Sequence, residues 1–264
     1  MPHSRPAAVA GMFYPDNAEQ LTQHIDDLLS SVPPHDEHNL GPSALIVPHA
    51  GTIYSGPIAA SAYTTLVGSQ DRYRAVVLFG PSHRVPFSGM AVPEASTFEI
   101  PGATLFIDTD LFQRASSFQG VIASDKPHQL EHSLEVQLPF LWTIFGSIPI
   151  LPIAVGHPNQ AQLAKVIDAL WTDDILLVIS TDLSHYLVQS EANEVDRRTA
   201  DAIGTLDPSQ LSTEHACGIK ALSAFLHTAR LRNARIVELD LRTSADTAGT
   251  PERVVGYGAW SIYL

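Results

Sequence analysis

Near-continuous apolar runs alternate along the chain with segments of helical periodicity. Four runs carry few polar side chains: residues 44–48, 75–80, 148–155 and 174–180. Such runs are typical of strands that are buried on both faces of a parallel sheet. Helical spacing predicts helices in four further segments: 56–66, 159–171, 190–206 and 217–231. This alternation predicts an α/β fold, a three-layer sandwich with helices on both faces of a mostly parallel sheet, formed by residues 1–264 as a single domain.

The rest of the chain adds shorter elements. Apolar positions 21, 25, 28 and 29 predict an N-terminal helix that follows an N-cap at Asp16, with Glu19 three residues further on. The prolines and charges of residues 30–43 indicate an exposed loop. Other segments predict strands, first an antiparallel excursion and then two closing strands: 89–93, 98–100, 103–108, "ARIVELDLR" and "RVVGYGAWSIYL".

A further helix is predicted over residues 128–142. Four leucines form its apolar stripe: Leu130, Leu134, Leu138 and Leu141. Pro139 should kink or end this helix, whereas Pro57 is well placed at the first position of the helix at 56–66. Glu131 and His132 lie off the stripe, where they are candidates for residues that support a metal site or face a substrate. A solvated helix face is an equally good interpretation.

Three of the predicted buried strands are followed closely by a histidine. These are His49 in "LIVPHAG", His83 in "LFGPSH" and His185 in "VISTDLSH". Ligands of open α/β sheets bind at the carboxyl ends of the strands, so parallel neighbours would bring the three imidazoles to one edge. Any one of these histidines is better explained as a residue that bonds a local carbonyl. Their recurrence favours a site, and Asp182 lies in the same turn as His185.

Neutral imidazole is the commonest metal ligand in proteins, but two histidines need a further donor. Cys217 is a candidate, because it lies just before or at the start of the helix at 217–231, where the helix N-terminus favours a thiolate. Two histidines with one anionic donor resemble the facial arrangement on non-haem iron. The wide spacing of His49, His83 and Cys217 is unlike the short-spaced pairs of structural zinc. On spacing alone, an inert buried cysteine is the commoner case.

The charge and composition of the chain argue against several classes of function. The net charge is −13, from 15 basic and 28 acidic residues, and no basic stripe suited to nucleic acid occurs. No apolar run approaches the ~18 residues of a membrane helix, and the N-terminus has no signal pattern. We therefore expect no nucleic-acid or membrane partner and a cytoplasmic location. The single cysteine excludes an internal disulfide.

Several motifs occur in a distinctive order along essentially the whole chain. They are "AGMFYP" (10–15), "PHAGTIYSG" (48–56), "GPSH" (80–83), "EHSLEVQLPFL" (131–141), "STDLSHY" (180–186), "ACGIKAL" (216–222) and "VVGYGAW" (254–260). In these motifs the chain resembles the Memo family, whose bacterial and archaeal members are called AmmeMemoRadiSam system protein B. The resemblance implies an α/β sandwich related in fold to the class III extradiol dioxygenases of the LigB type, with a site at the strand ends.

The dioxygenases hold Fe(II) with two histidines and a glutamate, and a further histidine acts as acid and base. The resemblance therefore implies His49, His83 and Cys217 as metal ligands and His185 as the acid–base residue, with Asp182 beside it. Cys217 stands in place of the glutamate, and a thiolate changes the charge at the metal and oxidises readily. Iron is the expected cofactor, with copper and zinc as alternatives.

Three functions are consistent with these residues. The first is a metal-dependent redox enzyme, similar to a dioxygenase, that oxidises a small molecule with O₂. The second is a metal- or peptide-binding protein without turnover. The third is a hydrolase that uses Ser82 or Ser184 with a histidine and Asp182, and it ranks last because "GPSH" is not a G-x-S-x-G turn.

Overall fold

A mixed sheet of nine strands runs through the part of the chain that the computed structural model describes, residues 3–33, 41–212 and 214–264. In chain order its strands are β2 (Ala44–Val47), β3 (Ala75–Pro81), β4 (Met90–Val92), β7 (Val121–Ala123), β8 (Ile150–Val155), β9 (Ile175–Ser180), β10 (His185–Leu187), β11 (Arg235–Thr243) and β12 (Val254–Tyr263). Across the sheet the order is β10-β12-β2-β9-β3-β8-β4-β7, with β11 also paired to β12. The central strands β2, β9, β3 and β8 are parallel, so their carboxyl ends lie at one edge.

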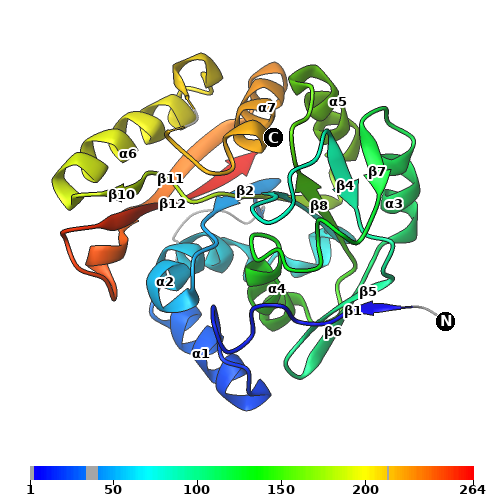
Figure 1. Cartoon of the computed structure of the whole chain (residues 1–264), viewed down its shortest axis with the longest axis horizontal. Helices are drawn as coiled ribbons and strands as arrows, with labels where there is room; N and C mark the ends of the chain where they lie inside the picture. The colour runs from blue at the N-terminus through cyan, green and yellow to red at the C-terminus, as the bar shows by residue number, and fades with distance from the viewer. Residues whose placement is uncertain (1–2, 34–40, 213) are drawn as a thin grey trace.

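Helices cover both faces of this sheet (Figure 1). One layer holds α1 (Ala18–Ser30), α2 (Thr52–Tyr63) and α4 (Leu138–Phe145). The opposite layer holds α3 (Thr109–Ser116), α5 (Gln160–Leu170), α6 (Gln189–Gly204) and α7 (Ile219–Leu231). Each face of the sheet packs against its helices in a hydrophobic core. Alternate side chains of β2 lie in these two cores: Leu45 and Val47 in the core on the α2 side, and Ala44 and Ile46 in the core on the α7 side. The predicted three-layer α/β sandwich is confirmed.

Antiparallel strands flank the parallel centre of the sheet, and one of them, β4, lies within the predicted antiparallel excursion. On one side β4 is antiparallel to β8, and on the other β12 is antiparallel to β2, β10 and β11. A separate sheet contains β1 (Ser4–Arg5), β5 (Thr97–Ile100) and β6 (Ala103–Phe106), of which β5 and β6 form an antiparallel pair. Among the described residues, no helix is both long and apolar enough to cross a bilayer.

Two predicted helix starts differ from the structure. Asn17, not Asp16, is the N-cap of α1, and its side chain accepts a hydrogen bond from the Gln20 N–H at 3.0 Å. The prediction that Pro57 begins a helix is wrong, because α2 starts five residues earlier at Thr52 and Pro57 lies inside it. The Thr52 N–H donates to the Phe13 carbonyl at 2.7 Å, so a distant segment bonds the start of α2.

The predicted helix over residues 128–142 is correct only for residues 138–142, which lie in α4. Turns lead into a short 3-10 helix, Glu135–Gln137, and then into α4. Pro139 lies in the first turn of α4, where its missing N–H costs nothing, so it neither kinks nor ends the helix as predicted. Leu130 does not join the core, since 63% of it is exposed, whereas the other three leucines of the predicted stripe are buried.

The predicted exposed loop at 30–43 is also only partly correct. Residues 34–40 lie outside the described residues, and residues 41–43 are buried. The Tyr73 hydroxyl donates to the Pro42 carbonyl at 2.7 Å, and the Ser43 N–H donates to the Ile262 carbonyl. These long-range contacts hold residues 41–43 against the sheet, directly before β2.

Candidate metal centre

The three central strands that precede predicted site residues end at one place. His49, His83 and Asp182 each lie two residues beyond the end of a strand, β2, β3 and β9 respectively. Cys217 lies two residues before α7, and His185 begins β10. All five residues line one cleft of about 1670 Å³, together with His132. The structure therefore brings together the predicted site residues other than Glu131, which lies behind His83.

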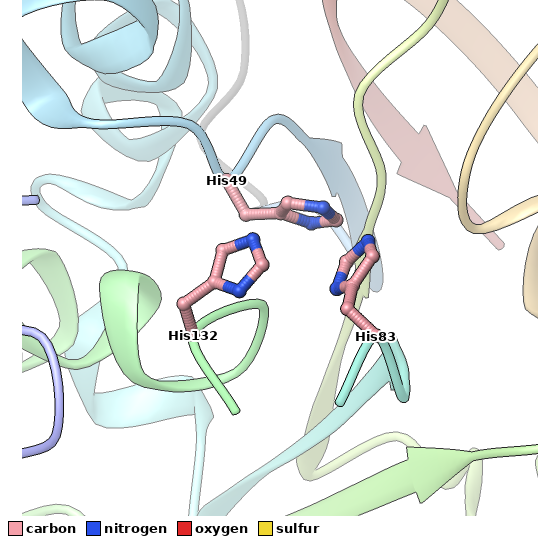
Figure 2. A group of neighbouring side chains, drawn as sticks. All are labelled: His49, His83 and His132. Carbon is pink, nitrogen blue, oxygen red and sulfur yellow. The ribbon is translucent and has the colours of Figure 1, made fainter. Parts of the chain in front are cut away.

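Three imidazoles form a compact cluster in this cleft. Figure 2 shows the rings of His49, His83 and His132 turned toward one another from three different loops. The ring centroids are 4.5–5.4 Å apart, and one nitrogen from each ring lies within 4.8 Å of the others, a spacing that could hold a metal ion. His132 was expected near the site only as a supporting or substrate-facing residue. The sequence feature that could have indicated its place in the cluster is its position next to Glu131 in the "EHSLE" motif.

His49 is the buried member of the cluster. Burial lowers the pKa of its imidazole well below the ordinary value, and the neighbouring His83 and His132 lower it further. The ring is therefore neutral, as a metal ligand must be. Its Nδ1 lies 2.8 Å from Ser180 Oγ, and its Nε2 lies 3.2 Å from Cys217 Sγ.

His83 is bound from behind by Glu131. The Nδ1 of His83 lies 2.8 Å from Glu131 Oε1, and three main-chain N–H groups donate to the same carboxylate, from His83, His132 and Ser133. Burial alone would raise the pKa of Glu131, but the His83 hydrogen bond and charge and the main-chain donors lower it to about 2. A buried carboxylate on the Nδ1 of a histidine is a common support for a metal ligand, because it leaves Nε2 free.

Cys217 is a protonated thiol in the metal-free chain. Burial, with a contribution from the Asp182 carboxylate, raises its pKa to about 12. The start of α7 acts in the expected direction, since the Gly218 main-chain N–H lowers the pKa of Cys217, but burial outweighs this effect in the metal-free chain. The Asp182 N–H lies 3.3 Å from Sγ, and the thiol also lies beside His49. A bound cation would reverse the balance by displacing the thiol proton.

Asp182 does not orient His185 by a direct hydrogen bond. Its Oδ1 accepts the main-chain N–H of His49 at 2.7 Å, and its Oδ2 lies 4.0 Å from His49 Nε2. The Nδ1 of His185 instead lies 2.7 Å from the Leu183 carbonyl oxygen. Because a carbonyl only accepts, Nδ1 carries the proton and Nε2 is the basic nitrogen of His185.

The serine arrangement that a hydrolase needs is not formed in the described part of the chain. The Ser82 hydroxyl donates to the Val85 carbonyl at 2.8 Å, and the Ser184 side chain is buried and faces the Asp196 carboxylate. Neither hydroxyl is hydrogen-bonded to a histidine, so neither has the general base that a nucleophilic serine requires.

The family profile described as "Memo-like protein" matches residues 5–261. The chain belongs to the Memo family. A MEMO1 family protein of Aquifex aeolicus is 31% identical over 265 residues, covering 96% of this chain and 97% of that protein. A MEMO1 family protein of Methanosarcina acetivorans is 33% identical over 272 residues, covering 97% of each.

The fold of this Memo-family chain is similar to that of one distantly related protein of known structure. The crystal structure of the uncharacterised protein JW3007 from Escherichia coli K12 matches with a TM-score of 0.54. It is 13% identical, and the match covers 81% of this chain and 98% of that one. At this identity the likeness concerns the fold alone.

Proposed function

We propose that this Memo-family chain binds a transition metal, preferentially iron, through His49, His83 and Cys217 and uses it in dioxygenase-like redox chemistry on a small substrate. The observation that carries the proposal is the meeting of the buried His49 and the neighbouring His83 with the only cysteine of the chain at the ends of parallel strands. Each proposed histidine ligand has its Nδ1 against an oxygen, Ser180 Oγ or Glu131 Oε1, which leaves Nε2 for a metal.

The donor set suits a soft-to-borderline transition metal. Imidazole suits iron, copper and zinc, and thiolate adds negative charge and softness. A hard cation such as Mg²⁺ or Ca²⁺ prefers carboxylate and carbonyl oxygens. When bound, the metal would supply redox and Lewis-acid chemistry in the cleft. His132 lies beside this set as a further imidazole.

The residues of the chain divide the remaining work. His185, with its Nδ1 held by Leu183, can take a proton from a substrate hydroxyl at Nε2 and return it later. Asp182 fixes the main chain of His49 and contributes negative charge near the site. Phe13 and Tyr257 add aromatic surface to the cleft, which suits a planar substrate.

A non-catalytic metal- or peptide-binding role is the second candidate, and the size of the cleft favours it. At about 1670 Å³ the cleft exceeds the roughly 300–1,000 Å³ of typical small-molecule sites. Tyr54 and Tyr186 line it and are exposed, and exposed tyrosines are frequent anchors in binding surfaces. A longer ligand such as a peptide would occupy more of this space.

The test combines metal loading with oxygen uptake. Protein purified without oxygen is incubated with iron(II), copper or zinc, and bound metal is measured in the parent, His49→Ala and His83→Ala. The parent should retain metal, the two variants should lose it, and the iron-loaded parent should consume oxygen with at least one of a panel of aromatic diols. Binding without oxygen uptake would favour the second candidate. Absence of binding by the parent for all three metals would overturn the proposed metal site.

A further inference from the structure

Ser180 makes a buried set of contacts behind His49. Its side chain is fully buried at the end of β9, and its Oγ has three partners. The Ser133 carbonyl oxygen lies at 2.6 Å, Gln137 Nε2 at 3.0 Å and His49 Nδ1 at 2.8 Å. These contacts join β9, the loop after β2 and the segment 131–137, none of which is adjacent in sequence.

The direction of each hydrogen bond is set by what the partners can do. A serine hydroxyl has one proton, a carbonyl oxygen only accepts, and an amide nitrogen only donates. Ser180 therefore gives its proton to Ser133 and accepts from Gln137. Nothing remains for it to donate to His49, so the His49 contact requires that His49 Nδ1 carries a proton and donates to Ser180 Oγ.

The orientation of the Gln137 amide is fixed by its other contacts. Its Nε2 also donates to the Pro48 carbonyl at 2.9 Å, and its Oε1 accepts from the Tyr63 hydroxyl at 2.9 Å. A reversed amide would place Oε1 against the Pro48 carbonyl oxygen, two acceptors without a proton between them. The amide nitrogen therefore faces Ser180. The donor and the acceptor of each hydrogen bond between Tyr63 and His49 are thereby determined.

We infer that Ser180 and Gln137 are positioning residues that hold His49 as the Nδ1–H tautomer, so that the lone pair of Nε2 faces the metal position. This inference rests on the proposed metal site and specifies how the chain prepares it. Glu131 acts in the same way on His83. The segment 131–137 thus orients both histidine ligands, one directly and one through Ser180, which gives the "EHSLEVQ" motif a role that a solvated helix face would not have.

The experiment has two readouts, and the first needs no metal. In the metal-free parent, long-range ¹H–¹⁵N spectra of the histidine rings should show His49 as the Nδ1–H tautomer. In Ser180→Ala the acceptor is gone, and the spectra should show the Nε2–H form or a mixture. The second readout is the zinc dissociation constant from chelator competition, which should rise roughly 10- to 100-fold in Ser180→Ala.

Ser133→Ala is the matched control. It removes a neighbouring buried hydroxyl that donates to the Pro81 carbonyl, but it keeps the Ser133 carbonyl that Ser180 uses. The control should keep the parent's His49 tautomer and a zinc affinity within about threefold of the parent, below the loss expected from a lost supporting contact. Melting temperatures of all three proteins show whether the variants are folded.

The outcomes separate this inference from the proposed function. An Nε2–H tautomer for His49 in the parent overturns the inference, whether or not the protein binds metal or the variants fold. Unchanged zinc affinity in folded Ser180→Ala also overturns it, as does an equal loss in Ser133→Ala. A parent with the Nδ1–H tautomer that binds no zinc, iron or copper would instead overturn the proposed metal site.

Discussion

His83 Nδ1 and Glu131 Oε1 lie 2.8 Å apart and join loops that are 48 residues apart in the sequence. The same carboxylate accepts the main-chain N–H groups of His83, His132 and Ser133. Glu131 therefore holds the imidazole of His83 and the main chain of His132 through one buried charge. This arrangement makes the carboxylate both a structural and a site residue, and the two contributions can be measured separately.

Glu131→Gln should weaken both folding and metal binding. The variant keeps the shape of the side chain but loses charge-assisted hydrogen bonds, so we expect a loss of about 1–3 kcal/mol in the free energy of unfolding at pH 7. The pKa of Glu131 in the folded chain is depressed to about 2. The greater stability of the parent is therefore fully present above the ordinary glutamate pKa and declines as the pH falls toward 2. Urea unfolding should therefore show a smaller difference at pH 3 than at pH 7.

Zinc affinity in Glu131→Gln should fall by roughly 10- to 100-fold, because the support of His83 is weakened. Glu94→Gln, a change at an exposed glutamate, is the control and should alter neither quantity. A stability difference that is the same at both pH values would contradict the assigned role of the Glu131 charge.

His185→Ala should separate proton transfer from metal binding. The proposed ligands do not include His185, so the variant should fold and keep the parent's metal affinity, while any turnover found in the parent is lost. His49→Ala and His83→Ala should instead lose the metal. Metal analysis and oxygen uptake, measured on the same preparations, check both expectations. Loss of metal from folded His185→Ala would show that His185 is itself a ligand.

Cys217→Ser and His132→Gln together test which donors complete the site. The cysteine lies beside His49, and His132 packs against both His49 and His83. We expect Cys217→Ser to weaken zinc or cobalt(II) binding at least 10-fold and His132→Gln to weaken it less. Cobalt(II) adds a direct signal, since a thiolate ligand gives an intense near-ultraviolet charge-transfer band that the Cys217→Ser protein should lack. The opposite ranking would assign the site to the three histidines.

The convergence of His49, His83 and Asp182 could be predicted from the sequence because it depends on few contacts. Buried apolar runs identify the strands, and parallel pairing alone brings the residues after β2, β3 and β9 to one edge. The boundaries of these strands were predicted to within two residues. Residues directly after a buried parallel strand are therefore accessible to sequence reasoning.

The place of His132 could not be derived in this way, because the leucine spacing around it indicated a helix that does not form. Turns there let Leu130 face solvent while Glu131 turns inward to accept four hydrogen bonds. A local hydrophobic pattern does not report such long-range polar contacts, which here outweigh helix formation. The same limit applies to Ser180 and Gln137, whose partners are distant in sequence.

Asp196 is a buried carboxylate of α6 that lies behind the His185 turn. Its Oδ1 accepts the Ser184 N–H at 2.9 Å, the Ser184 side chain faces the same carboxylate, and its Oδ2 is buried against Gly256. Burial raises the pKa of Asp196 to about 6. An unfolded aspartate loses its proton near pH 4, so between about pH 4 and 6 the folded chain binds the extra proton and its stability falls as the pH rises.

Asp196→Asn should remove this loss while keeping an oxygen to accept from Ser184. The variant should match the parent at pH 4 and exceed it at pH 7.5 by about 1–3 kcal/mol in the free energy of unfolding, the upper value corresponding to the full pKa difference. Urea unfolding at both pH values measures the change. Asp173→Asn, which removes the same charge from an exposed loop, should show no such pH-dependent gain. An Asp196→Asn protein that is less stable than the parent at pH 7.5 would mean that the ionised carboxylate stabilises the fold, contrary to the effect of its burial.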